Sequence, residues 1–519
     1  MSGELTAVRE VWAQRSQART RADVLYLLYV VALSALVIAA PGLQMAGSLL
    51  ARPDVIPALA HPLAPQATTS LAFAAAAALV LLGAVRGPAL LPPFFTATLA
   101  ASGIRRRTAL WRPLARALLV PVLAALTAAA LVAVTLVSAA HAATSGAVHF
   151  VIAAAGTGLL LGGAWLSGEL LRGGARRLLA GGLAAASVLG SFLPGMPGPG
   201  RAYPMASEGM GTAPGVGLWA PGLLLAGLLV SGVGILLLDR VRGSVLREQA
   251  ARWDSAGTLA TTGDLAGASG MFRTPPSAGR RLRAIGPRPL VLLYARRDAV
   301  SWLRSPERFV VGVVTSLLAA AVLAGSTLLT GPLSWGAVLL GAAALWGAGG
   351  TLVDGIRHGV HTLGAPALFG QSAATQVVLH AIAPLLLLSL LAALGGTLTG
   401  VVAAGFAVDG GPGLSGTGLW EAVLLPVALA PVMIIGRVRD AAKGPLPLAL
   451  VTPMPTAQGD LSILPMLAWQ SDAILLALVC GAVLAGLGLL GPAWLLGGAV
   501  VLTAVMALMA RVRLRELTR

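Results

Sequence analysis

The stretch VLHAIAPLLLLSLLAALGGTLTGVVAA, residues 378–404, carries no carboxylate, lysine or arginine along its whole length. A helix needs about 20 mainly apolar residues to cross a bilayer, so this run is long enough to span one. Further runs of the same character lie on both sides of it. Their number and length predict an all-α, polytopic transmembrane helical bundle of about twelve spans. The spans are expected at 24–49, 68–85, 115–140, 147–168, 178–194, 217–238, 309–330, 333–352, 378–404, 419–436, 472–490 and 492–510.

The composition excludes a soluble protein. Of the 519 residues, 57% are hydrophobic and 11% are charged, whereas soluble domains carry about 25% charged residues. The single cysteine, Cys480, lies inside an apolar run, which excludes a disulfide framework and a thiolate metal cluster.

The distribution of basic residues predicts the topology. With twelve spans and both termini in the cytoplasm, only Arg52 and Arg201 among the 36 lysines and arginines fall in outer segments. Residues 1–23 are then a cytoplasmic segment before an uncleaved first span. We therefore assign the net charge of +17 to membrane topology and not to nucleic-acid binding, and we expect a multi-pass protein of the cell (inner or cytoplasmic) membrane.

The chain is predicted to divide into two six-span halves, 1–239 and 289–519, joined by a cytoplasmic linker at 240–288. The linker is small, polar and proline-broken in its middle. Each half is expected to begin with an interfacial amphipathic helix, VREVWAQRSQARTRAD with Trp12 and LYARRDAVSWLRSPER with Trp302. In the second helix, Leu292, Ala295, Ala299 and Trp302 form the apolar stripe, and Arg296, Arg297, Asp298 and Arg304 face away from it.

Two long loops on the cytoplasmic side, 86–113 and 353–377, are candidate functional segments. The first contains Arg105, Arg106, Arg107 and Arg112, which either determine topology and contact lipid phosphate or belong to a short helix with a docking surface. In the second, Asp354, Arg357, His358 and His361 share one helical face. Zinc could use the aspartate and histidines, but Arg357 opposes a cation, so we expect a polar cap and no metal site.

Recognisable catalytic chemistry is missing from the sequence. There is no P-loop, because the only lysine, Lys443, follows Ala442, and there is no HExxH zinc helix. The carboxylates near the spans, Glu169, Asp239, Asp354, Glu421 and Asp472, all lie at span ends. His380 is the one candidate for a proton relay, and a hydrogen-bonded packing role is the commoner explanation for such a histidine. We expect no catalytic residue and no cofactor in this chain.

This arrangement resembles the membrane subunits of ABC-2-type exporters. The resemblance rests on an amphipathic helix before each half, a long inner loop after each second span, six spans per half and a longer outer loop after the fifth span. It implies an exporter permease that works by alternating access, with ATP and Mg²⁺ bound by partner ABC ATPase subunits at the cytoplasmic face. It also implies coupling helices in the loops at 90–113 and 357–377. The second half departs from the pattern, since Gly491-Pro492 alone joins its last two spans.

The apolar spans favour a lipophilic or amphipathic substrate, whose binding residues are unknown, and membrane lipid is an expected partner. The sequence leaves open a second permease chain as a further partner. It also leaves open a proton-coupled secondary carrier like the major facilitator superfamily, although the long loop after the second span does not match that family's short motif-bearing one. A non-transporting membrane scaffold or sensor is the third alternative.

Overall fold

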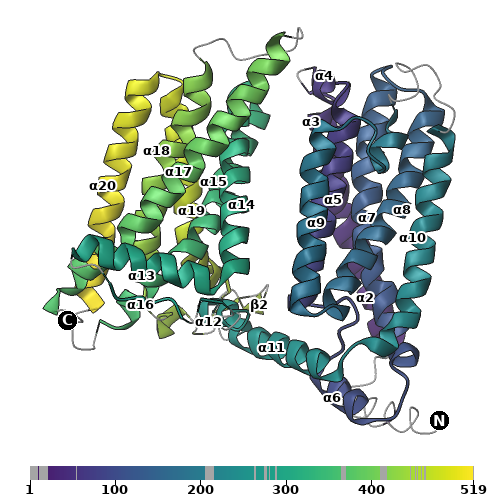
Figure 1. Ribbon diagram of the computed structural model, residues 1–519, viewed down its shortest axis with the longest axis horizontal. Coiled ribbons are helices and arrows are strands. Elements are labelled where there is room, and N and C mark those ends of the chain that lie inside the picture. The colour runs from purple at the N-terminus through teal and green to yellow at the C-terminus, as the bar shows by residue number, and fades with distance from the viewer. Residues whose placement is uncertain are drawn as a thin grey trace. The chain divides into compact units, whose positions relative to one another are not determined.

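The computed structural model forms two compact units, Met1–Thr258 and Leu259–Arg519, each built from long helices (Figure 1). We call them unit 1 and unit 2 and describe each by itself. The residues that the structure describes are 10, 21–53, 55–204, 216–261, 265–273, 278–279, 281–286, 289–363, 370–408, 418–444, 446–450, 452, 454–456, 459–460 and 463–517.

Eleven helices among the described residues are long and apolar enough to cross a membrane. The prediction of an all-α, multi-pass membrane protein is confirmed at this level. The expected span at 178–194 is also a helix, α9 (Gly173–Phe192), but it is not one of the eleven. Arg176 and Arg177 in its first turns and its several glycines dilute its apolar character.

Unit 1 begins with a nearly continuous helix in which a π-helical turn separates two α-helical parts. No residue of the second part is buried within the unit. The elements of unit 1 are α2 (Arg21–Ser34), η1 (Ala35–Ala39), α3 (Ala40–Leu50), α4 (Ile56–Leu59), α5 (Ala64–Val85), α6 (Pro93–Ala101), α7 (Arg106–Ser138), α8 (Thr144–Leu170), α9, η2 (Pro199–Ala202), α10 (Val216–Leu237), η4 (Leu238–Arg240) and α11 (Gly243–Thr261), which runs across the unit boundary.

Helix α8 is the centre of unit 1 and packs against α5, α7 and α10. Glycines permit this close packing, as small residues do between membrane helices. A Cβ on Gly156 would collide with the backbone of Leu223 in α10, and one on Gly158 would lie 2.9 Å from the carbonyl oxygen of Pro121 in α7.

Residues 193–204, which follow α9 in the chain and precede α10, form a cap over one end of unit 1. They fold back against α5 and α8, and Pro199, Gly200 and Ala202 are buried. The Tyr203 hydroxyl donates a hydrogen bond of 2.9 Å to the carbonyl oxygen of Leu59, and burial raises the pKa of Tyr203 to about 12. The cap is therefore an integral part of the packed unit.

Unit 2 has a larger continuous core, centred on α18. Its elements are α12 (Leu265–Gly270), α13 (Leu290–Arg304), α14 (Pro306–Gly325), η5 (Ser326–Leu328), α15 (Pro332–Leu352), α16 (Asp354–His361), α17 (Ala373–Val408), α18 (Gly418–Ala441), η7 (Leu448–Leu450), β1 (Pro455–Thr456), β2 (Gly459–Asp460), α19 (Ile463–Gly488) and α20 (Pro492–Leu517). The two short strands pair antiparallel.

The two units repeat one arrangement of helices. In each, a short helix (α6 or α16) follows the second long helix, and a proline-containing long helix (α7 with Pro121, α17 with Pro384) comes next. Helix α7 packs on α8, and α8 packs on α10; helices α17, α18 and α20 follow the same pattern. The α5–α9 pair of unit 1 likewise corresponds to the α15–α19 pair of unit 2.

Two segments differ from expectation. The predicted linker 240–288 contains the boundary between the units, but its first part is the 19-residue helix α11 and not an irregular tether. The span expected at 472–490 begins earlier, since α19, which follows η7 and the β1–β2 hairpin, begins at Ile463.

Candidate functional site

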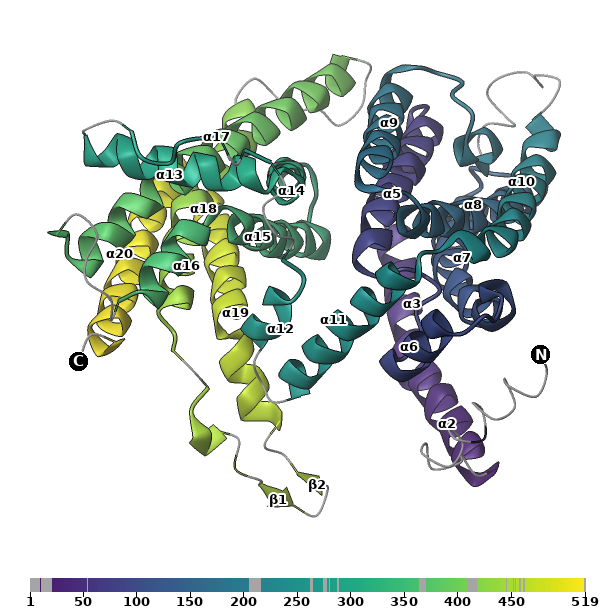
Figure 2. The same cartoon turned by 60° about the horizontal axis from the view of Figure 1, so that its bottom comes forward.

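In each unit, one end collects the polar and charged contacts. This is the end at which α5 ends and α7 begins in unit 1, and at which α15 ends and α17 begins in unit 2; we call it the basic end. Figure 2 shows α13 and α16 at this end of the long helices of unit 2, and α6 and α11 at that of unit 1. The sequence-predicted site residues belong to these segments.

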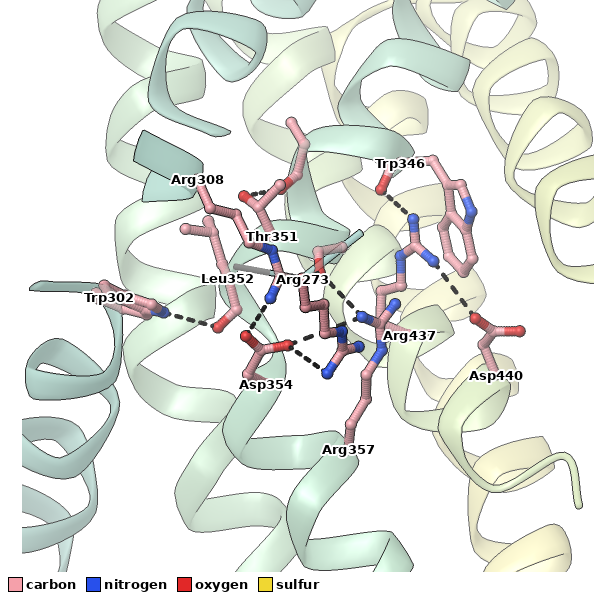
Figure 3. Close-up of polar contacts among 12 residues, drawn as sticks. Arg273, Trp302, Arg308, Trp346, Thr351, Leu352, Asp354, Arg357, Arg437 and Asp440 are labelled. Atoms are coloured by element: carbon pink, nitrogen blue, oxygen red, sulfur yellow. Dashed lines mark hydrogen bonds and ion pairs between the residues drawn. The ribbon is translucent and has the colours of Figure 1, made fainter. Parts of the chain in front are cut away.

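Asp354, the first residue of α16, is surrounded by three arginines (Figure 3). It forms an ion pair with Arg308 of α14, and its Oδ1 lies 3.8 Å from Nη1 of Arg357 and 3.8 Å from Nη1 of Arg273. Arg308 and Arg357 also donate hydrogen bonds to the carbonyl oxygen of Gly350, at 3.0 and 3.3 Å. The start of α16 is therefore fixed to the ends of α14 and α15.

Arg437 of α18 adds a further cation beside this cluster. Its guanidinium lies over the Trp346 ring at 3.7 Å and donates to the Trp346 carbonyl oxygen at 2.5 Å. Asp440 accepts a hydrogen bond of 3.4 Å from the same guanidinium. The pKa of Arg357, in turn, is lowered by burial and by neighbouring Arg273, although Asp354 acts in the opposite direction. The cluster thus holds more positive than negative charge.

A buried acid–imidazole pair joins α13 to α17. The Asp298 carboxylate lies 2.8 Å from Nδ1 of His380, and both side chains are 2% exposed. Tyr294 packs edge-on against the imidazole, with 4.7 Å between ring centroids. Burial raises the pKa of Asp298 despite the opposing effect of His380.

Helix α16 reaches this pair through a glycine. A Cβ added to Gly355 would collide with Oδ1 of Asp298, so only a glycine allows α16 to approach so closely. Trp302 links α13 to two further helices. Its Nε1 donates a hydrogen bond of 2.9 Å to the carbonyl oxygen of Leu352 in α15, and its ring stacks on that of Phe309 in α14. Helices α13, α14, α15, α16 and α17 are therefore linked at one place.

A second cation cluster lies where α18, α19 and α20 meet. Asp472 of α19 accepts hydrogen bonds from Arg439 at 2.8 Å and from Arg513 at 3.1 Å, and it also contacts Lys443. The ammonium nitrogen of Lys443 lies over the Trp469 ring, 4.8 Å from its centroid. The single carboxylate of Asp472 thus forms ion pairs with three cations.

The basic end of unit 1 is held mostly by neutral groups. The Gln249 amide of α11 donates to the carbonyl oxygens of Gly83 and Ala84, each at 3.1 Å, and accepts from the Gly87 N–H at 3.0 Å. Two indoles add to this contact, Trp253 to the carbonyl oxygen of Val85 and Trp165 to that of Arg86. Helix α11 is thereby attached to the end of α5.

The arginines predicted in the first loop lie at the start of α7, beyond α6. Arg105 precedes α7, and the Arg107 backbone N–H donates to Asp239 at 3.0 Å. Nη2 of Arg106 lies 3.0 Å from the position that a Cβ on Gly243 would occupy, and Arg112 stacks on Trp111 at 5.3 Å. The expected span at 115–140 begins earlier, at Arg106, because a helical turn rich in arginine carries no apolar signal.

The remaining predicted residues divide into inward and exposed groups. Arg357 joins the Asp354 cluster, whereas His358 and His361 are exposed, and no group of three or more metal-ligating His, Cys, Asp or Glu side chains occurs among the described residues. Arg296 donates to the carbonyl oxygen of Arg283, and Arg297 is half-buried. Trp12 and most of its expected amphipathic helix lie outside the described residues.

One orientation predicted from the sequence is wrong. Asp298 was expected on the face of α13 directed away from the apolar stripe, but it is buried, and Leu292 of the stripe is 56% exposed. The buried face of α13 instead contains Leu293, Tyr294, Asp298 and Val300. On this face Asp298 forms its hydrogen bond with His380 of α17, 82 positions along the chain.

The sequence reasoning also missed Arg437 and Arg439, which are 9% and 6% exposed. Their position at the end of an apolar run was the available signal, since a charge there is costly unless it is paired.

Searches against protein-family models, curated proteins and solved structures found no match to this chain.

Proposed function

We propose that this chain is the membrane permease subunit of an ABC transporter and exports a lipophilic or amphipathic substrate by alternating access. Separate ATPase subunits, which bind ATP and Mg²⁺, supply the energy at the basic ends, which face the cytoplasm in this proposal. The observation that carries it is the repeated short helix after the second long helix of each unit, α6 and α16. A chain with two such elements has two equivalent places at which a partner can push.

Both short helices are attached to the spans that would have to move. Helix α16 is tied to α13, α14 and α15 through Asp354, Gly355 and their partners. In unit 1, Leu99 of α6 belongs to the same buried cluster as Leu110 of α7 and Leu246 of α11. A displacement of either short helix therefore cannot remain local.

The helix after each short helix is the longest of its unit. Helix α7 has 33 residues and α17 has 36, and both contain an internal proline. A proline inside a helix removes one backbone hydrogen bond and introduces a kink. A push at α6 or α16 would change the tilt or kink of a long span, which is the kind of movement that alternating access requires.

The apolar character of the spans supports the proposed class of substrate. Charged side chains of the described spans gather near the helix ends, and exposed faces such as those of α7, α10 and α17 are lined with leucine and valine. A substrate that partitions into such surroundings is lipophilic over most of its area.

Cysteine cross-linking tests the partner. Cys480 is the only cysteine and is buried, so a Cys480→Ser background accepts single reporters. Ala97→Cys on α6 and His358→Cys on α16 place a thiol at exposed positions of the two short helices. We expect both to cross-link to a co-purifying P-loop ATPase, whereas the control Leu489→Cys, 81% exposed in the turn before Gly491, does not. A full-length chain that recovers no ATPase, or cross-links from Leu489→Cys alone, contradicts the proposal.

The buried Asp298–His380 pair favours a proton-coupled carrier instead. Its carboxylate, however, lies on α13, which is not among the helices apolar enough to span a membrane. A proton relay is expected inside the bundle, where it can couple a gradient to movement. Substrate transport in vesicles distinguishes the two mechanisms: collapse of the proton gradient abolishes transport by the carrier, and ATP depletion abolishes transport by the ABC system.

A further inference from the structure

The cluster of Arg439, Lys443 and Arg513 carries more positive charge than the one carboxylate it shares can neutralise. Asp472 is the carboxylate that all three contact, so the four groups together have a formal charge of +2. Placing charges in a protein interior is costly unless they are paired. The cluster therefore requires further negative charge from outside these four residues.

Arg439 is the residue with unused hydrogen-bonding capacity. It is 6% exposed, and its Nη2 donates to Asp472, but its Nε and Nη1 have no hydrogen-bond partner in the structure. A guanidinium presents its donors in a planar fork that matches the oxygens of a carboxylate or a phosphate. Nε and Nη1 lie on different edges of the guanidinium, and each can donate to an oxygen of an anionic group.

An apolar pocket adjoins this guanidinium. It lies between α15, α18, α19 and α20, and Arg439 lines it together with Trp346, Met433, Leu476 and Met506. Close to the cluster, Leu475 on α19 and Met509 and Val512 on α20 are exposed, Val512 by 48%. The cations therefore border apolar surface, which an anion with a hydrocarbon chain covers and a small inorganic anion does not.

We propose that Arg439, Lys443 and Arg513 bind the phosphate of an anionic phospholipid at the junction of α18, α19 and α20. The acyl chains then lie along the exposed apolar face of α19 and α20. Trp469, which packs against Lys443, is the type of residue found at the level of the headgroups. Basic pockets between membrane helices are a recurrent form of binding site for anionic lipid headgroups. This proposal is independent of the proposed function.

Native mass spectrometry of the delipidated full chain in detergent measures the lipid preference. The probes are dioleoylphosphatidylglycerol, which is anionic, dioleoylphosphatidylcholine, which is zwitterionic, and inorganic phosphate. We expect phosphatidylglycerol to bind at least about tenfold more tightly than phosphatidylcholine, because two uncompensated charges attract it. Equal binding of the two lipids overturns the proposal, and so does displacement of phosphatidylglycerol by millimolar inorganic phosphate.

Three glutamine variants assign the preference to the cluster. Arg439→Gln and Arg513→Gln are expected to lower the ratio of phosphatidylglycerol to phosphatidylcholine binding several-fold. The control Arg511→Gln removes an equal charge from an exposed position of α20 and leaves the ratio unchanged. If Arg439→Gln does not fold, Arg513→Gln carries the test, since its side chain is more exposed. Wild-type selectivity in Arg513→Gln overturns the proposal.

Photocross-linking separates a lipid from a protein occupant. With p-benzoylphenylalanine at Val512 in native membranes, we expect the adduct to be a phospholipid. An adduct with a protein overturns the lipid assignment and identifies a docking surface instead. Co-purification of an ATPase is measured separately, so failure of one proposal does not imply failure of the other.

Discussion

The basic ends of the two units join equivalent helices with different side chains. In unit 1, the Gln249 amide and the indoles of Trp165 and Trp253 satisfy backbone groups at the end of α5. In unit 2, the corresponding region is joined by the Asp298–His380 pair and by arginines around Asp354. Neutral hydrogen bonds are insensitive to salt and pH over the physiological range, whereas ion pairs respond to both. The repeat therefore preserves the arrangement of helices and not the chemistry that holds it.

The two units also differ at their first long helix. No residue of α3 is buried within unit 1, whereas α14 buries six residues within unit 2 and is fixed by Arg308. Most of the expected amphipathic helix before α2 lies outside the described residues, and its counterpart α13 packs on α16 and α17. A well-packed first span in unit 2 thus coincides with an anchored interfacial helix.

The largest effect is expected from Asp298→Ala. Removal of Asp298 leaves the buried His380 imidazole without its hydrogen-bond partner, which costs about 3 kcal/mol or more. Hydrogen exchange of the full chain in detergent should show faster exchange in α13 and α16, with α6 and α11 unchanged. Asp298→Asn, which keeps the size and one hydrogen bond, is the matched control and should cost less. Equal losses from both variants would show that the carboxylate itself carries the contribution, and not the size of the side chain or its remaining hydrogen bond.

A smaller loss, confined to unit 1, is expected from Gln249→Ala. The variant leaves the Gly87 N–H and two carbonyl oxygens without their partner, and a buried unsatisfied group costs about 1–3 kcal/mol. Exchange should increase at the end of α5 and in α11, equally at low and high salt. A strong dependence on salt would contradict the neutral character assigned to this anchor.

The smallest effect is a pH dependence confined to unit 2. Burial raises the folded-state pKa of Asp298 above its usual value of 3.8, although His380 and Arg297 oppose the shift and Asp354 reinforces it. The folded state then binds more protons than the unfolded state, so this contribution is fully present below about pH 4 and is lost as the pH rises through the folded-state pKa. The unfolding free energy of the wild type relative to Asp298→Asn should therefore fall as the pH rises above about 4. A rise over this range would show that the ionised pair is the more stable form.

Helix positions were largely predictable from the sequence. The run 333–352 corresponds to α15 (Pro332–Leu352), because continuous apolar character directly reports the length of such a helix. The starts of α7 and α19 were placed too late, since their first turns contain arginines or a proline and continue the helix without an apolar signal. A helix end that is determined by backbone hydrogen bonds, and not by a change in apolar character, is therefore hard to locate from hydropathy.

The contacts at the candidate site were much less predictable. The sequence indicated that Asp354 and Arg357 share a helical face, since they are three positions apart, and the structure places them in one cluster. The pairing of Asp298 with His380 joins residues 82 positions apart, and no local periodicity reports it. Similarly, the glycine that admits α16, Gly355, is explained only by the carboxylate that faces it.

The ends of the two units opposite the basic ends have different surfaces, and this difference has a practical consequence. Unit 1 carries the packed cap of residues 193–204, whereas α19 and α20 of unit 2 are joined by a tight turn in which Gly491 has a φ of +124°. An antibody fragment selected against the cap would have a rigid, folded epitope that the α19–α20 turn does not duplicate. It would label unit 1 and not unit 2, and so give electron microscopy an unambiguous marker for distinguishing the two units.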